Sequence, residues 1–282
     1  MSIRIHADWY RGIQKAAWDP EGVSVLVGQN GAGKSTLLSI PLLLGKLEGG
    51  MLLNEALETV GGLWGVLCER AAKGDSAFIG VDLDGLRTNF CCGPKNQPER
   101  GVLSQGTALV WQDGYVMRVN ALEGEPESSL IAQAQHRVSL LALWQQEVEE
   151  RKASASKLSL LLSEYRVYAH YTLSALRERG SPQSSEKHLL PDGSNVFSLL
   201  RNWRDSADDE ERFEFVEAGL RKAFANDFKR FSFESAQTVV FAAFRDRQDV
   251  NVPARAVSDG MLTMLLHLCA IASAPARLHG GD

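Results

Sequence analysis

The chain opens with segments whose apolar and polar residues follow the period of β-strands. Residues 2–7 alternate between apolar and polar side chains, which predicts a half-buried strand. Residues 8–13 are expected to form a turn. Residues 23–27 (Val-Ser-Val-Leu-Val) predict a second strand, buried on both faces. The next apolar segment predicts a helix, and Pro41 within it favours a short or bent helix that ends near Gly45.

Two hairpin patterns occur in the next part of the chain. Residues 77–87 and 108–119 each contain two apolar-rich runs separated by a tight turn with an Asp-Gly pair. Together they predict an antiparallel β-subdomain over residues 76–120. The segment 91–106 between them is rich in Pro, Gly and Gln, so it is expected to form a loop.

From residue 128 onward the apolar period becomes helical. Residues 128–179 predict a helical hairpin or arm, in which the charged run near the middle is read as a solvated helix face. The rest of the chain predicts a loop at 180–194, helices at 195–204, 208–224 and 258–272, and strands at 231–233 and 238–244.

Composition narrows the class of protein. The chain has 282 residues, of which 44% are hydrophobic and 23% charged, as is ordinary for a globular protein. No apolar run approaches the ~20 residues of a membrane span, and the first residues lack the apolar core of a signal peptide. The net charge of −5 gives no support to direct nucleic-acid binding. Four cysteines without metal-ligand spacing favour a reduced, cytoplasmic protein; the adjacent Cys91 and Cys92 are expected to face opposite sides of a strand.

A glycine-rich stretch before the first helix carries a specific chemical signal. Residues 28–36 read Gly-Gln-Asn-Gly-Ala-Gly-Lys-Ser-Thr, with the G-x-x-x-x-G-K-S spacing of a phosphate-binding loop. Glycines let backbone N–H groups approach phosphate oxygens, and the helix N-terminus adds the positive end of its dipole. Lys34 is expected to reach the β- and γ-phosphates, and the Ser35 hydroxyl to bind Mg²⁺. The residues expected to bind the nucleotide are Gly28, Asn30, Gly31, Ala32, Gly33, Lys34, Ser35 and Thr36.

Other short segments have more than one interpretation. Residues 258–260 (Ser-Asp-Gly) open the last apolar helix, and by themselves they are typical of a helix N-cap. Residues 9–11 (Trp-Tyr-Arg) either pack at the sheet edge, which the local sequence favours, or form a rim beside the nucleotide base. Residues 82–85 have the D-x-x-G form of GTPase switches, but a hairpin turn explains them and no Asn-Lys-x-Asp guanine-binding motif occurs. A GTPase and a small-molecule kinase are therefore minor alternatives.

Four stretches together resemble the RecF/SMC-like ABC-class ATPases, and within them the predicted ATPases of the OLD-like group. The stretches are residues 9–12 after the opening strand, the phosphate-binding loop at 28–36, Pro-Asp-Gly-Ser-Asn at 191–195, and Ser-Asp-Gly-Met-Leu at 258–262. The resemblance implies an α/β P-loop NTPase fold like an ABC-ATPase head, with an antiparallel β-subdomain and a helical insert.

The resemblance also implies a division of the chain and an assembly. The expected parts are a P-loop lobe with the β-subdomain at 1–127, a helical arm at 128–179 and a signature-bearing lobe at 180–282. In that family the Ser-Asp-Gly signature caps the γ-phosphate in a partner's site, so a homodimer would close around ATP and Mg²⁺. Lys34 and Ser258 are then the expected catalytic residues. DNA maintenance or anti-phage defence beside an effector nuclease is the implied role.

The chain departs from the family pattern after its last apolar helix. The family continues into a strand that ends in Asp-Glu, whose aspartate orients Mg²⁺ and whose glutamate polarises the attacking water. Residues 274–282 read Ala-Pro-Ala-Arg-Leu-His-Gly-Gly-Asp instead. We therefore expect the chain to hold ATP without the usual catalytic carboxylates, either as a shortened form of a longer native machine or as a binding-only form.

Two functions of different classes remain open. The first is an ATPase head that dimerises on ATP and couples binding and hydrolysis to conformational change. The second is a hydrolysis-deficient, ATP-gated dimerisation or interaction module. The glutamine that senses Mg²⁺ in this class also stays open, because Gln105 and Gln112 both lie in the expected region.

Overall fold

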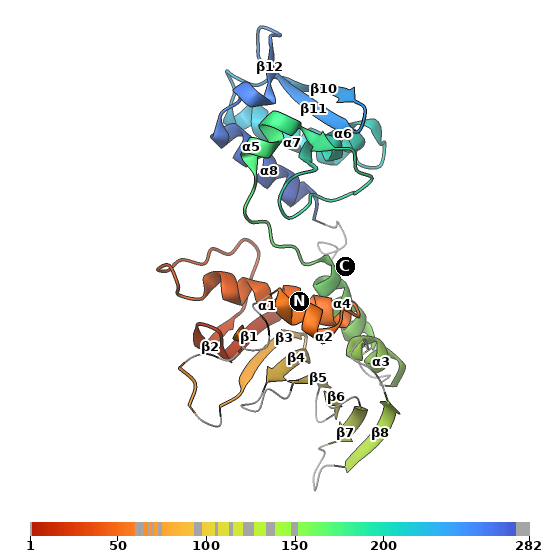
Figure 1. Ribbon diagram of the computed structural model, residues 1–282. Helices are drawn as coiled ribbons and strands as arrows, with labels where there is room; N and C mark the ends of the chain where they lie inside the picture. Colours follow the sequence, from red (N-terminus) through yellow and green to blue (C-terminus); the bar gives the residue numbers. More distant parts are fainter. Residues whose placement is uncertain are drawn as a thin grey trace. The chain divides into compact units, whose positions relative to one another are not determined.

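The chain folds into two compact units, Met1–Tyr165 and Arg166–Asp282. The boundary lies inside the segment 128–179 that was expected to be a helical arm. Figure 1 shows the computed structural model of the chain. The structure describes residues 2–59, 62, 65–66, 68, 70–72, 75–92, 98–104, 107–112, 115–120, 127–133, 139–147 and 152–274.

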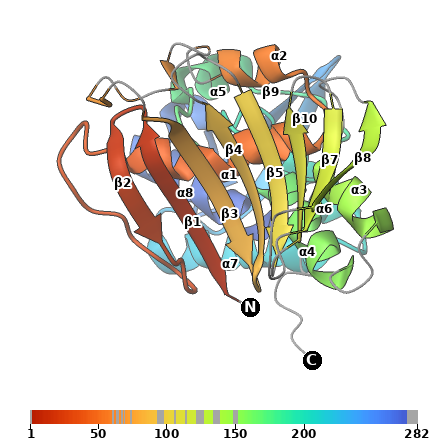
Figure 2. The same ribbon diagram turned by 90° about the horizontal axis from the view of Figure 1, so that it is seen from below.

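The N-terminal unit is built on one antiparallel sheet of eight strands, in the order β2-β1-β3-β4-β5-β6-β7-β8 (Figure 2). The strands are β1 (Ile3–Tyr10), β2 (Ile13–Trp18), β3 (Ala77–Leu83), β4 (Leu86–Cys92), β5 (Pro98–Ser104), β6 (Thr107–Gln112), β7 (Tyr115–Asn120) and β8 (Glu127–Gln133). The predicted antiparallel β-subdomain and both of its hairpins are confirmed. Asp84 and Gly85 join β3 to β4 with φ values of 49° and 84°, the backbone that two-residue hairpin turns require.

Two of the sequence-based assignments in this sheet are wrong. The segment 91–106, expected to be a loop, contains the end of β4 and strand β5, which pairs with both β4 and β6. Residues 127–133, at the start of the expected helical arm, form β8 and pair with β7. In both cases pairing with a neighbouring strand overrides the local composition, because an antiparallel ladder satisfies the backbone of almost any sequence.

The strand predicted at Val23–Val27 is also wrong. These residues belong to the irregular connection between β2 and the first helix, and none is paired with a strand among the described residues. Val23, Val25 and Val27 are 99%, 80% and 89% exposed rather than buried on both faces. The apolar run has the composition of a strand, but a strand also needs a hydrogen-bonding neighbour, and the described part of the sheet ends at β2.

The helices of the N-terminal unit lie on one face of its sheet (Figure 1). They are α1 (Lys34–Glu48), α2 (Leu53–Glu58), α3 (Leu140–Glu147) and α4 (Lys152–Glu164). Ile40, Leu43 and Leu44 of α1 pack against alternate strand residues such as Ile79 and Val81, all almost fully buried. The helix contains Pro41, yet it continues beyond the predicted end at residue 45, because its C-terminal turn is also held by the core.

A buried ion pair fixes the C-terminal end of α1. The Glu48 carboxylate accepts hydrogen bonds from the Arg100 guanidinium of β5 (3.0 Å), the Ser139 hydroxyl (3.0 Å) and the Leu141 N–H (3.0 Å). The side chains of Arg100 and Glu48 are 3% and 6% exposed. Arg100 also donates to the Leu47 carbonyl (3.2 Å). One carboxylate therefore connects α1, β5 and the start of α3 in the interior of the unit.

Glu48→Ala should lower the free energy of unfolding by about 3 kcal/mol, because the variant leaves the Arg100 guanidinium in the interior without this carboxylate. Urea denaturation followed by circular dichroism measures the loss. Asp19→Ala is the matched control, since it removes a carboxylate that pairs with Arg4 at the surface (2.7 Å). Equal midpoints for the two variants would show that the buried network is not a principal support of the unit.

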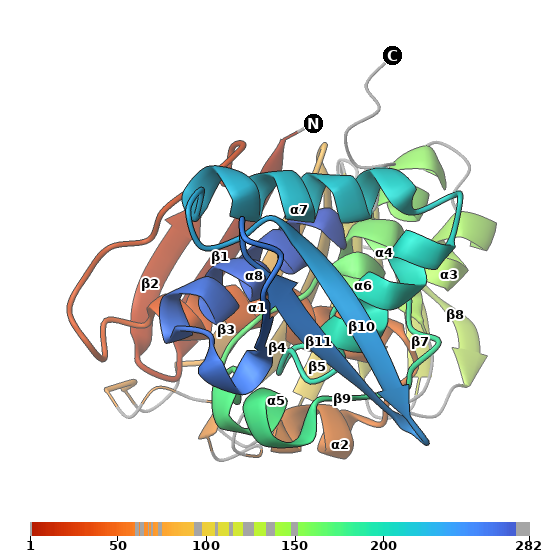
Figure 3. The same ribbon diagram turned by 90° about the horizontal axis from the view of Figure 1, so that it is seen from above.

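The C-terminal unit combines four helices with a small antiparallel sheet (Figure 3). Its elements are α5 (Leu173–Arg179), β9 (Ser181–Pro182), α6 (Val196–Asp205), α7 (Glu210–Ala223), β10 (Arg230–Ala236), β11 (Val239–Arg245), β12 (Asn251–Pro253), the 3₁₀ helix η3 (Ala254–Ala256) and α8 (Asp259–Ala272). The helices and strands predicted here from residue 195 onward are confirmed. Leu262, Leu265 and Leu266 of α8 lie in its core with Phe197 and Trp203 of α6.

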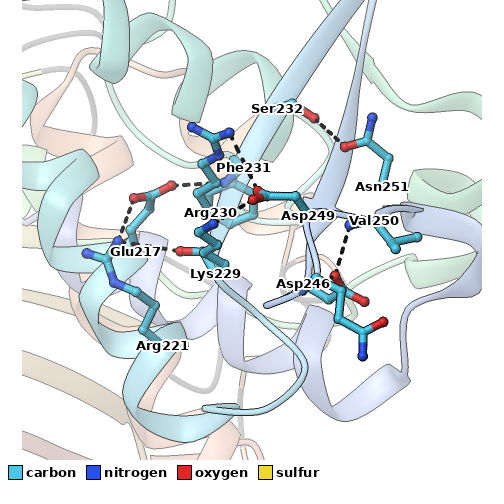
Figure 4. A network of polar contacts seen from close by, with 11 residues as sticks. Glu217, Arg221, Lys229, Arg230, Phe231, Ser232, Asp246, Asp249, Val250 and Asn251 are labelled. Atoms are coloured by element: carbon cyan, nitrogen blue, oxygen red, sulfur yellow. Dashed lines mark hydrogen bonds and ion pairs between the residues drawn. The ribbon is translucent and has the colours of Figure 1, made fainter.

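A chain of polar contacts joins α7 to the β10–β11 hairpin (Figure 4). Glu217 of α7 accepts a hydrogen bond from the Phe231 N–H (2.9 Å) and pairs with Arg221 (3.1 Å). Lys229, just before β10, pairs with Asp249 in the turn between β11 and β12 (2.7 Å). Arg221 and Lys229 are therefore each paired with a carboxylate of the same unit.

Both units are thus mixed α and β with antiparallel sheets, in keeping with the predicted α/β class.

No helix in the described ranges combines the length and the apolar character needed to cross a bilayer. Cys92 of β4 is buried and its neighbour Cys91 is partly exposed, as expected for residues on opposite faces of a strand. Residues 274–282, where the family pattern fails, lie outside the described residues except for Ala274.

Candidate nucleotide-binding site

The glycine-rich loop leads directly into α1, as its sequence predicts. Gly31 and Gly33 have φ values of 81° and 86°, in the left-handed region that glycine adopts readily. Gly33 occupies the N-cap position of α1, so no side chain caps the helix, and its first turn contains no acidic residue. The N–H groups of the first turn therefore keep the capacity to bind an anion at the positive end of the helix.

The Lys34 side chain folds back over its own loop. Its Nζ donates hydrogen bonds to the carbonyl oxygens of Gly28 and Gln29, each at 2.7 Å. The loop is closed further by the Ala32 N–H, which donates to the Gln29 carbonyl (3.2 Å). The ammonium group thus lies at the centre of the loop, where a phosphate oxygen could replace a neutral carbonyl as its partner at a gain in strength.

Gly33 is also required by close packing against the sheet. A Cβ atom at this position would lie 2.7 Å from Cγ1 of Ile13, a residue of β2 that is 7% exposed. Ile13 is β-branched and buried, so it has little freedom to move aside. The start of α1 is therefore held against β2 at a distance that only glycine permits.

A cavity of about 380 Å³ adjoins the loop. Its apolar walls come from Ile13 and Ala16 of β2, from Leu26 of the connection and from Leu37 of α1. Its polar lining comes from Gln14, Lys15, Lys34 and Arg70, and no acidic residue is among the described residues that line it. The volume lies within the ~300–1,000 Å³ typical of small-molecule sites. The cavity combines apolar surface with three positive charges, which suits an organic anion.

The tip of the β1–β2 hairpin anchors one wall of the cavity. Arg11 N–H donates to the Val66 carbonyl and Cys68 N–H donates to the Trp9 carbonyl, both at 2.8 Å. Trp9 and Arg11 have positive φ values of 50° and 53°, an uncommon conformation for such side chains. Tyr10 between them is fully buried, and this burial raises the pKa of its hydroxyl, although Arg11 acts in the opposite direction. For Tyr10 the packing interpretation of residues 9–11 is therefore confirmed.

The predicted nucleotide-binding residues fall into two groups. Ala32, Gly33 and Lys34 line the cavity, as the motif predicts. The others are in the loop or in the first turn of α1 but do not line the cavity: Gly28, Asn30, Gly31, Ser35 and Thr36. Gln14, Lys15 and Arg70 were not predicted. Gln14 and Lys15 lie in β2, for which no strand was predicted, and Arg70 lies in the segment after α2, so their convergence on the cavity depends on the tertiary structure.

Ser258 belongs to the C-terminal unit and is the N-cap of α8. Its hydroxyl oxygen accepts a hydrogen bond from the Met261 N–H (3.2 Å), which confirms the helix-cap interpretation. Asp259 pairs with Arg177 of α5 (2.6 Å), and Arg177 also donates to the Val257 carbonyl (2.7 Å). Ser258 and Asp259 remain exposed. The turn is therefore rigidly held, while the Ser258 hydroxyl proton has no acceptor among the described residues.

The other predicted motifs have structural roles or lie outside the described residues. In the segment 191–195, the Asn195 side chain accepts from the Leu190 N–H (2.9 Å) and donates to the His188 carbonyl (3.0 Å), so it closes a turn before α6. Residues 82–85 form the end of β3 and its hairpin turn. Gln105 lies outside the described residues, and Gln112 ends β6.

In comparisons with known proteins, the chain matches no family model and no curated sequence. The function of the chain is therefore inferred from the motif and from the geometry of the cavity beside it.

Gly33→Ala should lower the melting temperature more than Gly31→Ala. Both substitutions place alanine at a positive φ, at a cost of roughly 1–2 kcal/mol, but only the methyl group at residue 33 would meet Ile13; a Cβ at Gly31 has open space. Thermal unfolding of the two variants measures the difference. Identical melting temperatures would mean that the contact with Ile13 relaxes without cost.

Proposed function

We propose that this chain is an ATP-binding head of the ABC class, similar to the RecF/SMC and OLD-like ATPases. The observation that carries the proposal is the glycine-rich loop at the uncapped N-terminus of α1, beside a cavity with three cationic side chains. A nucleoside triphosphate supplies both a polyanionic tail for the loop and an apolar, planar base for the cavity.

The residues present fit ATP. Backbone N–H groups of the loop and of the first turn of α1 would hold the phosphates, and Lys34 would exchange its loop carbonyls for phosphate oxygens. The base would lie against the apolar wall of Ile13, Ala16 and Leu26, beside the Gln14 side chain. Bound ATP would supply the free energy that is released when water hydrolyses the bond to its γ-phosphate. The chain's own residues would bind and orient the nucleotide.

Mg²⁺ fits less completely. The Ser35 hydroxyl is exposed in the first turn of α1 and would provide one oxygen ligand. The described residues around the cavity include no carboxylate to hold the ion from the other side or to activate water. The second candidate function, an ATP-gated dimerisation or interaction module with little turnover, therefore stands beside the ATPase.

The P-loop NTPase fold and the homodimer are parts of the same proposal. In it, the signature at Ser258 caps the γ-phosphate in the site of a second copy, using the hydroxyl proton that its N-cap bond leaves unused. The resemblance further suggests a partner effector such as a nuclease, acting in DNA maintenance or anti-phage defence in the cytoplasm.

Lys34→Ala should weaken Mg-ATP binding at least ten-fold, because the variant loses a charge-assisted hydrogen bond to phosphate, worth about 1.5–3 kcal/mol. Isothermal titration calorimetry measures the affinity. Lys46→Ala is the matched control, since Lys46 lies in the last turn of the same helix. The proposal fails if the wild-type chain takes up no Mg-ATP or if both variants bind equally. Phosphate release that depends on Lys34 would identify an ATPase, and its absence the binding module.

Ser258→Gly should abolish ATP-dependent dimerisation while leaving the unliganded chain almost as stable as wild type. Glycine is tolerated at an N-cap at a cost of only about a few tenths of a kcal/mol, whereas alanine costs about 1 kcal/mol. Light scattering with and without Mg-ATP measures the dimer, and thermal unfolding checks the fold. A glycine variant that still dimerises on ATP would restrict Ser258 to its capping role.

A further inference from the structure

Two cations outside the glycine-rich loop face the cavity that the loop borders. Lys15 comes from β2 and Arg70 from the segment after α2, so neither belongs to the phosphate-binding motif. Neither forms an ion pair with any described residue, whereas many other basic side chains of the chain do. An unpaired cation that lines a cavity keeps its full capacity to bind an anion.

Both side chains are carried by backbone that other contacts hold in place. In the β1–β2 ladder Lys15 lies opposite Asp8, yet the two make no ion pair among the described contacts. The segment that leads to Arg70 is tied to the hairpin tip through the Val66 carbonyl and the Cys68 N–H. The two cations are therefore presented from two elements that the same hairpin connects, which lowers the cost of ordering them around a ligand.

Lys34 cannot supply all of the positive charge that a triphosphate needs. Two of its three N–H donors are directed to the Gly28 and Gln29 carbonyls, and the loop has no other charged side chain that lines the cavity. Mg²⁺ neutralises part of the charge of a triphosphate, and the rest is more than one ammonium and the roughly +0.5 charge of a helix N-terminus compensate. The remaining positive charge on the cavity wall belongs to Lys15 and Arg70.

We propose that Lys15 and Arg70 form a second phosphate clamp, which binds the polyphosphate of the ligand from the cavity wall outside the loop. The ligand class is a nucleoside triphosphate or another polyphosphate, and the inference rests on the proposed function. In this proposal the loop binds phosphate through backbone amides, and the attraction between the clamp's fixed positive charge and the ligand increases with the number of phosphates. Lys15 and Arg70 are thus positioning and specificity residues for the anionic tail.

The test compares Lys15→Gln, Arg70→Gln and the double variant with Lys157→Gln, which removes an exposed cation of α4 that does not line the cavity. Affinities for ATP, ADP and inorganic tripolyphosphate are measured by competition against a fluorescent ATP analogue. Each single variant should bind ATP roughly three- to ten-fold more weakly than the Lys157 variant. The double variant should lose more affinity for ATP than for ADP, and should lose affinity for tripolyphosphate as well. Its affinity should also depend less on salt concentration than that of the wild type.

Two results would overturn the clamp while the proposed function stands. One is a wild-type chain that binds ATP, together with a double variant that binds it as tightly. The other is a double variant that loses ATP but keeps tripolyphosphate binding, since the two residues would then contact the nucleoside. Failure of the wild-type chain to bind ATP would instead contradict the proposed function, so the two failures are distinguishable. Thermal unfolding of each variant confirms that the fold is retained.

Discussion

The position of α1 on the antiparallel sheet is the constraint on which the candidate site depends. At the start of the helix, Gly33 lies so close to Ile13 of β2 that no side chain fits between them. At its end, Glu48 is buried against Arg100 of β5. One contact is steric and the other electrostatic, and together they fix both ends of the helix. Because the uncapped N–H groups of α1 and the wall formed by β2 border the same cavity, a shift of the helix would change the shape and the charge of the site together.

The distribution of charge separates this site from the rest of the molecule. The chain is acidic overall, with a net charge of −5, and basic residues of the C-terminal unit such as Arg221 and Lys229 are neutralised by neighbouring carboxylates. Around the cavity the described lining contains cations and no carboxylate. Structural ion pairs cancel locally and project little field, whereas unbalanced charge at a partly apolar surface attracts ligands of opposite sign. The site therefore differs from the rest of the molecule because no carboxylate is among the described residues that line it, and not because it contains many basic residues.

Features set by short stretches of sequence were predictable, and features set by distant partners were not. The turn at Asp84 and Gly85, the helix cap at Ser258 and the glycine-rich loop each depend on a few adjacent residues, and all three were predicted. Strands β5 and β8 have the composition of a loop or a helix, and they form because a neighbouring strand pairs with them. Likewise the motif indicates Lys34, but the convergence of Lys15 and Arg70 on the same cavity arises from the fold.

The failure of the predicted strand at 23–27 has a consequence for the glycine-rich loop. A loop held between a paired strand and a helix has fixed ends, but here the preceding segment has no strand partner among the described residues. The first half of the loop is held instead by the Lys34 ammonium, through the Gly28 and Gln29 carbonyls. A phosphate that binds Lys34 competes for these same donors. In the proposed complex, ligand binding would therefore replace contacts that order the loop, and the backbone amides would take their place by binding the phosphate themselves.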